Sequence, residues 1–227
     1  MSPFSIFYYL VLSFIYILAI PYLIFKSRNS KYRQAIPAKF FLKDNVPFKE
    51  NGIWFHSCSM GETKAIKPLI DNYLENANIS VITNTGFEEA KKISPNVRYL
   101  PFEIFLPFWV NKQKVLVVME AELWYLLFLL AKKKGAKTLL INARISDKSY
   151  KSYKRFSFFY ERIFQNIDKV FAQSQLDKNR LEELGASNVE VIGNIKLAQL
   201  PKVNVELVKP KQVVITAAST HKNEEKL

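Results

Sequence analysis

Short apolar runs alternate with segments of helical periodicity from Ile53 to Ile192, and this alternation constrains the fold more than any other feature of the chain. The apolar runs predict these strands: Ile53–Ser57, Ile79–Thr83, Val97–Leu100, Val115–Met119, Thr138–Ile141, Lys169–Ala172 and Val189–Ile192. The segments between them predict these helices: Gly61–Glu75, Phe87–Ile93, Phe105–Asn111, Leu123–Lys134, Phe156–Asn166 and Leu176–Leu184. Nearly all-apolar strands joined through helices are typical of a parallel sheet covered on both faces. We therefore expect an α/β domain over residues 51–196.

The segment from Pro3 to Phe25 contains no charged residue and consists mainly of Ile, Leu, Phe and Tyr. A helix of this length spans about 30–35 Å, which is enough to cross the hydrocarbon core of a bilayer. A cleaved signal peptide would begin with positive charge, have a shorter apolar core and end at small residues, and the segment shows none of these features. The sequence therefore predicts a transmembrane anchor over residues 1–27.

Basic residues follow the predicted anchor at once: Lys26, Arg28, Lys31, Arg33 and Lys39. The positive-inside rule keeps them, and the chain after them, in the cytoplasm. Each basic residue near an anionic membrane surface contributes about 1 kcal/mol of binding. This juxtamembrane segment, residues 28–50, accounts for part of the net charge of +13, and no nucleic-acid-binding motif accompanies it. We expect anionic membrane lipids as the partner, and no nucleic acid.

Cysteine and histidine are scarce in this sequence. The single cysteine, Cys58, excludes an intrachain disulfide framework and is typical of a reducing compartment. One cysteine and two histidines leave little material for a zinc site, so we expect no metal.

The strongest candidate for chemistry is the turn after the first predicted strand, where Ser59, Gly61 and Glu62 precede a helix. The spacing Ser59-x-x-Glu62 fits a capping box, in which the two side chains satisfy free amides of the first helical turn. The same carboxylate could act as a general base, because the dipole at a helix N-terminus favours the ionised form. The two roles are compatible, and Gly61 would let a substrate approach the backbone closely. No role is assigned to three neighbours: His56, Cys58 and Met60.

Other polar turns follow other predicted strands. Thr85 and Gly86 belong either to an ordinary turn or to a set of hydroxyl and amide donors for a phosphate or carboxylate. Glu120 and Glu122 follow Val115–Met119, the strongest buried strand, and α/β sheets bind ligands at the carboxyl ends of their strands. The alternative for both glutamates is a helix start in which acids complement the dipole.

Two more turns carry a basic residue beside an asparagine. Asn142 and Arg144 follow Thr138–Ile141, and Arg144 is either a surface charge or an ionic partner of a glutamate or a substrate anion. Asn194 and Lys196 follow the last strand of the predicted domain. Lys196 would face a cleft between two domains, although lysines are so frequent here that a solvated surface position is the alternative.

The alternation of apolar runs and helical segments stops between Leu197 and Gln212, where two prolines interrupt a charged stretch. We interpret residues 197–212 as an interdomain linker. Val213–Ala217 then resembles a new buried strand, and a polar turn with Ser219, Thr220 and His221 follows it. The sequence predicts that residues 213–227 begin a second α/β domain that is truncated.

Eight motifs, taken together and in this order, resemble the 3-deoxy-D-manno-octulosonic acid (Kdo) transferase family of Gram-negative bacteria. They are HSCSMGE, TNTGFEEA, YLPFE, MEAELW, NARISDKSYKSY, FAQSQLDKNRLEELGA, GNIK and ASTHKNEE. The resemblance implies a Rossmann-like N-terminal domain of a metal-independent glycosyltransferase of the B fold, with the active site in an interdomain cleft. It also implies transfer of Kdo from CMP-Kdo to the lipid A precursor, lipid IVA, at the cytoplasmic face of the inner membrane.

The resemblance assigns roles to individual residues. Glu62 becomes the base that activates a glucosamine hydroxyl, and Glu122 and Lys196 stabilise the transition state of an inverting transfer. The substrate-binding candidates are Ser59, Gly61, Thr85, Gly86, Glu120, Asn142, Arg144 and Asn194. Ser219, Thr220 and His221 would face the nucleotide. Because the family's main CMP-binding motifs lie beyond Leu227, we expect this chain alone to have little or no transferase activity. Two alternatives are another membrane-anchored B-type glycosyltransferase and a non-catalytic, membrane-tethered lipid-binding module.

Overall fold

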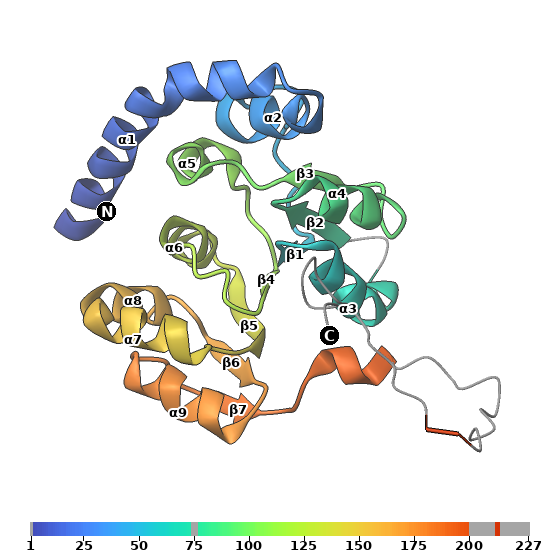
Figure 1. Ribbon diagram of the computed structural model, residues 1–227. Helices are drawn as coiled ribbons and strands as arrows, with labels where there is room; N and C mark the ends of the chain where they lie inside the picture. The colour runs from blue at the N-terminus through green and yellow to red at the C-terminus, as the bar shows by residue number, and fades with distance from the viewer. Residues whose placement is uncertain (1, 74–76, 200–211, 214–227) are drawn as a thin grey trace.

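A seven-stranded parallel sheet forms the centre of the computed structural model, which describes residues 2–73, 77–199 and 212–213. The strand order is β3-β2-β1-β4-β5-β6-β7 (Figure 1). The strands are β1 Ile53–Ser57, β2 Ala77–Val81, β3 Val97–Tyr99, β4 Val115–Met119, β5 Lys137–Ala143, β6 Lys169–Ala172 and β7 Val189–Val191. Every neighbouring pair is parallel, which confirms the predicted α/β fold.

Helices connect the strands and cover both faces of the sheet (Figure 1). The α-helices after β1 are α3 Met60–Asp71, α4 Asn84–Lys91, α5 Leu106–Trp109, α6 Tyr125–Lys133, α7 Asp147–Arg155, α8 Ser157–Phe164 and α9 Gln175–Glu183. Two short 3-10 helices are η3 Glu103–Phe105 and η4 Ile195–Gln199. Before β1 lie α1 Pro3–Ser27, η1 Ser30–Tyr32 and α2 Ala35–Phe41.

Two of these helices, α2 and α7, were not predicted. α7 has no fully buried residue; only Tyr150 and Tyr153 pack against the core, and two tyrosines among polar residues are a weak signal for a helix. It begins instead at Ser146, whose hydroxyl accepts a hydrogen bond from the Ser149 amide as a helix N-cap. α2 is only seven residues long, too short for its periodicity to stand out.

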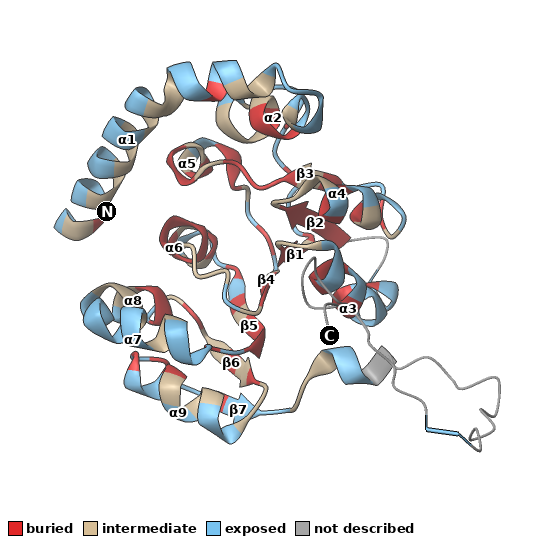
Figure 2. Ribbon diagram, viewed as in Figure 1, coloured by how far each residue is buried: buried red, intermediate tan, exposed pale blue. Residues whose placement is uncertain are grey.

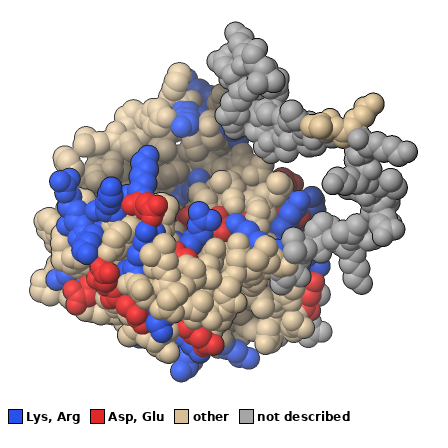
Figure 3. Space-filling model, turned by 60° about the horizontal axis from the view of Figure 1, so that its bottom comes forward, with Lys and Arg blue, Asp and Glu red and all other residues tan. Residues whose placement is uncertain are grey.

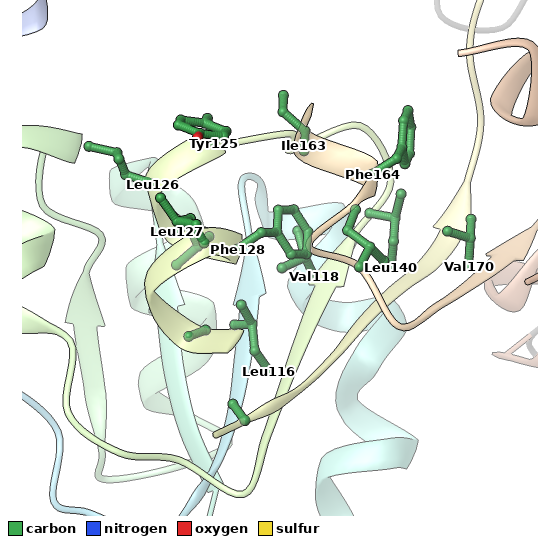
Figure 4. Packing of buried hydrophobic residues seen from close by; sticks show 14 of the residues in the cluster. Leu116, Val118, Tyr125, Leu126, Leu127, Phe128, Leu140, Ile163, Phe164 and Val170 are labelled. Carbon is green, nitrogen blue, oxygen red and sulfur yellow. The ribbon is translucent and has the colours of Figure 1, made fainter. Parts of the chain in front are cut away.

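The core has two layers, one on each face of the sheet. Successive strand residues point to opposite faces, so Leu116 and Val118 pack on one side while Val117 and Met119 pack on the other. On the first side, side chains of β4, β5 and β6 meet α6 and α8 (Figure 4). On the second side, α3 and α4 pack against β1, β2 and β3. The helices bury their sheet-facing residues and expose the opposite ones (Figure 2).

Within the described part of the chain, α1 is the one helix that is long and apolar enough to cross a membrane, judged by length and composition. The excess positive charge does not form a continuous basic surface on the face drawn in Figure 3. There, the described Lys and Arg side chains are interspersed with Asp and Glu.

Candidate active site

Polar side chains gather where the parallel strands end. All seven strands run the same way, so the segments that follow β1, β4 and β5 lie at one edge of the sheet. α3 begins at this edge directly after β1, and η4 returns from β7 to contact α3. The structure thereby brings together four of the predicted site residues: Glu62, Glu120, Glu122 and Lys196.

Glu62 is held at the start of α3 by a modified capping box. The Ser59 hydroxyl caps the helix by accepting the Glu62 amide at 3.3 Å, and it donates to Glu62 Oε1 at 2.9 Å. Glu62 Oε2 accepts the Cys58 amide at 2.8 Å, one residue before the Ser59 amide that a capping box would use. These bonds fix the carboxylate at the edge of the sheet, where Glu62 is 8 % exposed.

The pKa of Glu62 is raised, which differs from the effect expected from the helix dipole alone. Burial is the main cause, and it outweighs the hydrogen bonds from Cys58 and Ser59 that favour the ionised form. The negative charges of Glu120 and Glu122 raise the pKa further. A carboxylate with a raised pKa binds a proton more strongly, which makes it a better general base once it is ionised.

Replacing Glu120 with glutamine should therefore move the acid limb of the activity profile to lower pH. A general base must be ionised to accept a proton, so with Glu62 in that role activity would fall as the pH drops through its pKa. Removing a neighbouring negative charge stabilises ionised Glu62 and lowers that pKa. The measurement is kcat/KM against pH for the complete product of the gene. E88Q, which removes an exposed carboxylate on α4, is the matched control and should leave the limb in place.

Glu122 is held by aromatic and imidazole neighbours. The indole Nε1 of Trp124 donates to Glu122 Oε2 at 2.8 Å, and His56 Nε2 lies 3.8 Å from the same oxygen. Burial alone would raise the pKa of Glu122, but the contacts with His56, Trp124 and Cys58 outweigh it and hold the pKa below its ordinary value. Glu122 is therefore ionised near neutral pH.

His56 is a site residue that the sequence interpretation missed. It is fully buried, and its Nδ1 lies 2.8 Å from the Ser80 hydroxyl. Its Nε2 has no hydrogen-bond partner among the described residues and lies beside Glu122. A buried polar side chain within the apolar run Trp54–Phe55–His56 was the available signal, because such groups normally need a partner.

Lys196 and Glu120 form an ion pair with a nitrogen–oxygen distance of 2.5 Å. Asn142 contacts Glu120 and the residue before Lys196. Its amide nitrogen lies 3.4 Å from Glu120 Oε1, and its Oδ1 accepts the Ile195 amide of η4 at 3.1 Å. Asn194 Oδ1 accepts the Lys196 amide at 3.0 Å and so shapes the same turn. Glu120 and Asn142 both have a φ of 54°, a left-handed conformation that is uncommon outside glycine. Such strained positions are often found at functional sites.

Arg144 does not pair with either glutamate. It is exposed, and it lines a surface cavity of about 290 Å³ together with Glu120, Ser149 and Tyr153. The ionic partner of Glu120 is therefore Lys196, and the pairing offered for Arg144 is wrong. Binding of a substrate anion by Arg144 stays a prediction.

The two glycines of the predicted site differ in their surroundings. A side chain on Gly61 would find open space, with its nearest neighbour, the Ser59 hydroxyl, 4.0 Å away. A side chain on Gly86 would lie 3.0 Å from Thr83 Oγ1 and 3.2 Å from the Cys58 carbonyl. Gly86 is buried and lets the start of α4 pack against the turn between β1 and α3, whereas Thr85 is exposed. Packing therefore explains Gly86, and ligand binding by Thr85 and Gly86 stays a prediction.

The substitution G86V should lower the free energy of unfolding by about 1–3 kcal/mol, because the added methyl groups overpack this junction. G61A is the matched control, and its stability should stay within about 1 kcal/mol of the unsubstituted chain. Urea unfolding of the two variants measures both values. Equal stability of the two would show that the junction can relax around a side chain.

Lys39 belongs to the basic juxtamembrane segment, yet the structure places it beside the turn of residues 58–61, called the catalytic turn below for the role proposed for it. Its ammonium group donates to the Ile82 carbonyl at 3.2 Å, just after β2, and burial lowers its pKa. Burial raises the pKa of the nearby Cys58 thiol to about 12, so that thiol offers Lys39 no negative charge near neutral pH. Lys39 has no ion pair with a carboxylate among the described residues.

Three predicted nucleotide-facing residues and most of the predicted linker cannot be placed in the structure. Ser219, Thr220 and His221 lie outside the described residues, as does most of the predicted linker. Within residues 2–73, 77–199 and 212–213, no group of three or more His, Cys, Asp or Glu side chains could hold a metal ion.

A family model described as 3-deoxy-D-manno-octulosonic-acid transferase (kdotransferase) matches residues 28–199. The 3-deoxy-D-manno-octulosonic acid transferase of Rickettsia bellii is 33 % identical over 194 residues, which cover 77 % of this chain and 46 % of the relative. The Chlamydia pneumoniae protein of the same name is 30 % identical over 210 residues, which cover 85 % of this chain and 48 % of the relative.

A third relative is a bifunctional glycosyltransferase/methyltransferase of Fusobacterium nucleatum. It is 35 % identical over 164 residues, which cover 66 % of this chain and 26 % of the relative. The chain thus spans about half the length of the two transferases and about a quarter of the Fusobacterium protein.

Proposed function

The chain belongs to the Kdo transferase family of glycosyltransferases, and from this premise we propose that it carries the acceptor side of an enzyme that transfers Kdo from CMP-Kdo to lipid IVA. In this proposal the acceptor is the phosphorylated glucosamine disaccharide of the lipid A precursor. The donor nucleotide binds chiefly to a second domain. The reaction proceeds with inversion at the anomeric carbon and without a metal ion.

The observation that carries the proposal is the position and environment of Glu62. Its carboxylate is fixed by the Cys58 amide and the Ser59 hydroxyl, lies beside Glu120 and Glu122, and has a raised pKa. A non-catalytic lipid-binding module has no need of three neighbouring carboxylates, because like charges repel each other and anionic lipids as well. A general base, in contrast, benefits from that arrangement.

The proposed reaction has one concerted displacement. Glu62 accepts the proton of an acceptor hydroxyl while the hydroxyl oxygen forms a bond to the anomeric carbon of Kdo. The bond from that carbon to the phosphate oxygen breaks, and CMP leaves with the electron pair. Lys196 lies beside Glu120 at the edge of the sheet that carries Glu62. There it can stabilise the negative charge of the departing phosphate or of the Kdo carboxylate. Glu122, held ionised by its neighbours, stabilises the positive charge that develops on the sugar ring.

We place the reaction at the inner membrane, on its cytoplasmic face. The apolar helix α1 and the basic residues after it suit a surface rich in anionic lipids, and the acceptor is itself a lipid. Lys39 is a basic residue that reaches from this segment to the catalytic turn, where it could contact a phosphate of the acceptor.

Acceptor-dependent release of CMP tests the proposal. The complete gene product is incubated with CMP-Kdo and lipid IVA, and the mass of the lipid product is measured by mass spectrometry. The expected result is a lipid heavier by one or more Kdo residues. Transfer of a different sugar would favour another B-type glycosyltransferase, and lipid binding without any transfer by the complete product would favour a non-catalytic module.

A further inference from the structure

Helix α1 does not stand apart from the globular domain but lies along it. The residues that face the domain recur every three or four positions, as one face of a helix does, and Ser5 and Leu23 are buried there. Tyr8 and Tyr9 pack against the core cluster that includes the buried residues of α6, and Tyr16 packs against Phe102 and Phe105. The contacts therefore extend over nearly the whole helix.

Polar bonds fix this inner face to the domain. The Tyr8 hydroxyl donates to Glu103 Oε2 at 2.6 Å, and the hydroxyls of Ser5 and Tyr125 lie 2.7 Å apart. The Tyr16 hydroxyl donates to the Phe40 carbonyl at 2.5 Å. Glu103 is 3 % exposed, and its other oxygen accepts the Leu126 amide at 2.6 Å. A buried carboxylate that lost its tyrosine donor would be left with an unsatisfied oxygen, which is costly.

The outer face of α1 is apolar from end to end and exposed. Its residues are Ile6, Phe7, Leu10, Val11, Phe14, Ile15, Ile17, Leu18, Tyr22, Ile24 and Phe25. Phe7, Leu18 and Phe25 are 65 %, 65 % and 71 % exposed. Figure 2 shows the two faces of the helix in different burial classes along its length. An exposed apolar surface of this extent marks a contact with a membrane or a partner.

A helix that crossed the bilayer could not make the inner contacts. At 1.5 Å per residue, Tyr8 lies about 28 Å from Ser27 along the helix axis. If residues after Ser27 began at one membrane surface, Ser5 and Tyr8 would lie near the opposite surface, far from Tyr125 and Glu103. The inner-face bonds and a spanning orientation therefore exclude each other.

We propose that α1 lies in the plane of the membrane surface, docked on the globular domain, with its outer face inserted into the acyl boundary of one anionic leaflet. The occupant of the apolar face is thus lipid. The basic residues at its C-terminal end, Lys26, Arg28, Lys31 and Arg33, complement anionic headgroups, which favours a membrane over a second copy of this cationic chain. This inference does not depend on which sugar is transferred.

The orientation has a consequence for the site. α1 leads through η1 into α2, and α2 carries Lys39 to the end of β2 beside the catalytic turn. An in-plane α1 therefore ties the membrane-binding surface to the edge of the sheet that carries Glu62. A spanning helix would leave that edge attached only through the segment after Ser27.

Cross-linking distinguishes the two orientations. The complete gene product, with Cys58 replaced by serine, carries S5C and Y125C and is reconstituted into vesicles of phosphatidylethanolamine and phosphatidylglycerol. A short bifunctional thiol reagent should link the two positions in most molecules. The matched pair F7C and Y125C, with the first cysteine on the outer face, should link at least tenfold less. Equal or absent linking in both pairs would overturn the docked orientation.

Two further measurements keep the proposal testable if cysteines at the buried positions 5 and 125 impair folding. A membrane-impermeant maleimide should label S2C as fully as K148C in sealed vesicles whose globular domain faces outward, because both lie on one side. Protection of S2C would show a spanning helix. A tryptophan introduced by F14W should be quenched by brominated lipid, and loss of quenching together with cross-linking between copies would show that a second chain covers this face.

Discussion

The substitution E62Q should lower kcat for Kdo transfer by the complete gene product by about 10²–10⁴-fold. Glutamine keeps the size of the side chain, and its carbonyl oxygen can still accept the Cys58 amide that binds Glu62 Oε2. It cannot accept a proton from the acceptor hydroxyl, so the loss falls on the chemical step. The stability of the variant should stay within about 1 kcal/mol, because the raised pKa of Glu62 means that the fold already tolerates a neutral group there.

E88Q is the control for this experiment, since Glu88 is an exposed carboxylate on α4 whose ion pair with Lys91 is weak and solvated. Steady-state release of CMP should be unchanged in E88Q. A drop in kcat of less than about tenfold in E62Q, with unfolding unchanged, would contradict the assignment of Glu62 as the base.

The substitution K196M should lower kcat by about 10²–10³-fold, which is the effect of removing one preorganised group that stabilises transition-state charge. A substrate can reach Lys196 because its side chain is 42 % exposed. Its ion pair with Glu120 holds it at the edge of the sheet that carries Glu62. Methionine keeps the apolar stem of lysine but has no charge. The loss should fall mainly on kcat, because the charge on CMP increases as the bond to Kdo breaks.

K92M provides the matched control, since Lys92 also forms an ion pair with a glutamate, at 2.9 Å, but on the outer surface of α4. Neither substitution should change the free energy of unfolding by more than about 1 kcal/mol, because both ion pairs are partly exposed. An increase in KM with kcat unchanged in K196M would assign Lys196 to substrate binding alone.

The sequence predicted the sheet well because its strands are apolar on both faces and stand between clear turns. β1, β4 and β6 have the predicted bounds, while β2 begins two residues before the predicted Ile79. The order of the strands could not be read from apolar runs, which carry no information about neighbours. α7 could not be predicted from apolar periodicity, because it contacts the core through only two tyrosines, Tyr150 and Tyr153, and has no fully buried residue.

The candidate site was predicted in its composition but not in its pairings. Polar residues after each strand converge because parallel strands end at one edge, which is a consequence of topology. Which side chain meets which is decided by loops whose course the sequence does not reveal. Lys196 therefore pairs with Glu120, whereas Arg144 stands free of both glutamates.

The effect of burial on the pKa of Glu62 could not be predicted from the sequence either. The helix dipole suggested an easily ionised Glu62, but desolvation and two neighbouring carboxylates dominate its pKa. In the same way, α1 is apolar enough to span a membrane by composition. Its contacts with the domain, such as those with Glu103 and Tyr125, reveal an inner face that the sequence hides, because tyrosine and serine hydroxyls do not interrupt an apolar pattern.

The pH dependence of single-turnover transfer by the complete gene product tests most directly whether Glu62 accepts the proton. The expected profile falls with decreasing pH through a pKa above the ordinary glutamate value of 4.5, since burial and neighbouring charges raise it. In E62Q that limb should disappear along with most of the rate. An acid limb of unchanged position and height in E62Q would contradict the proposed role of Glu62.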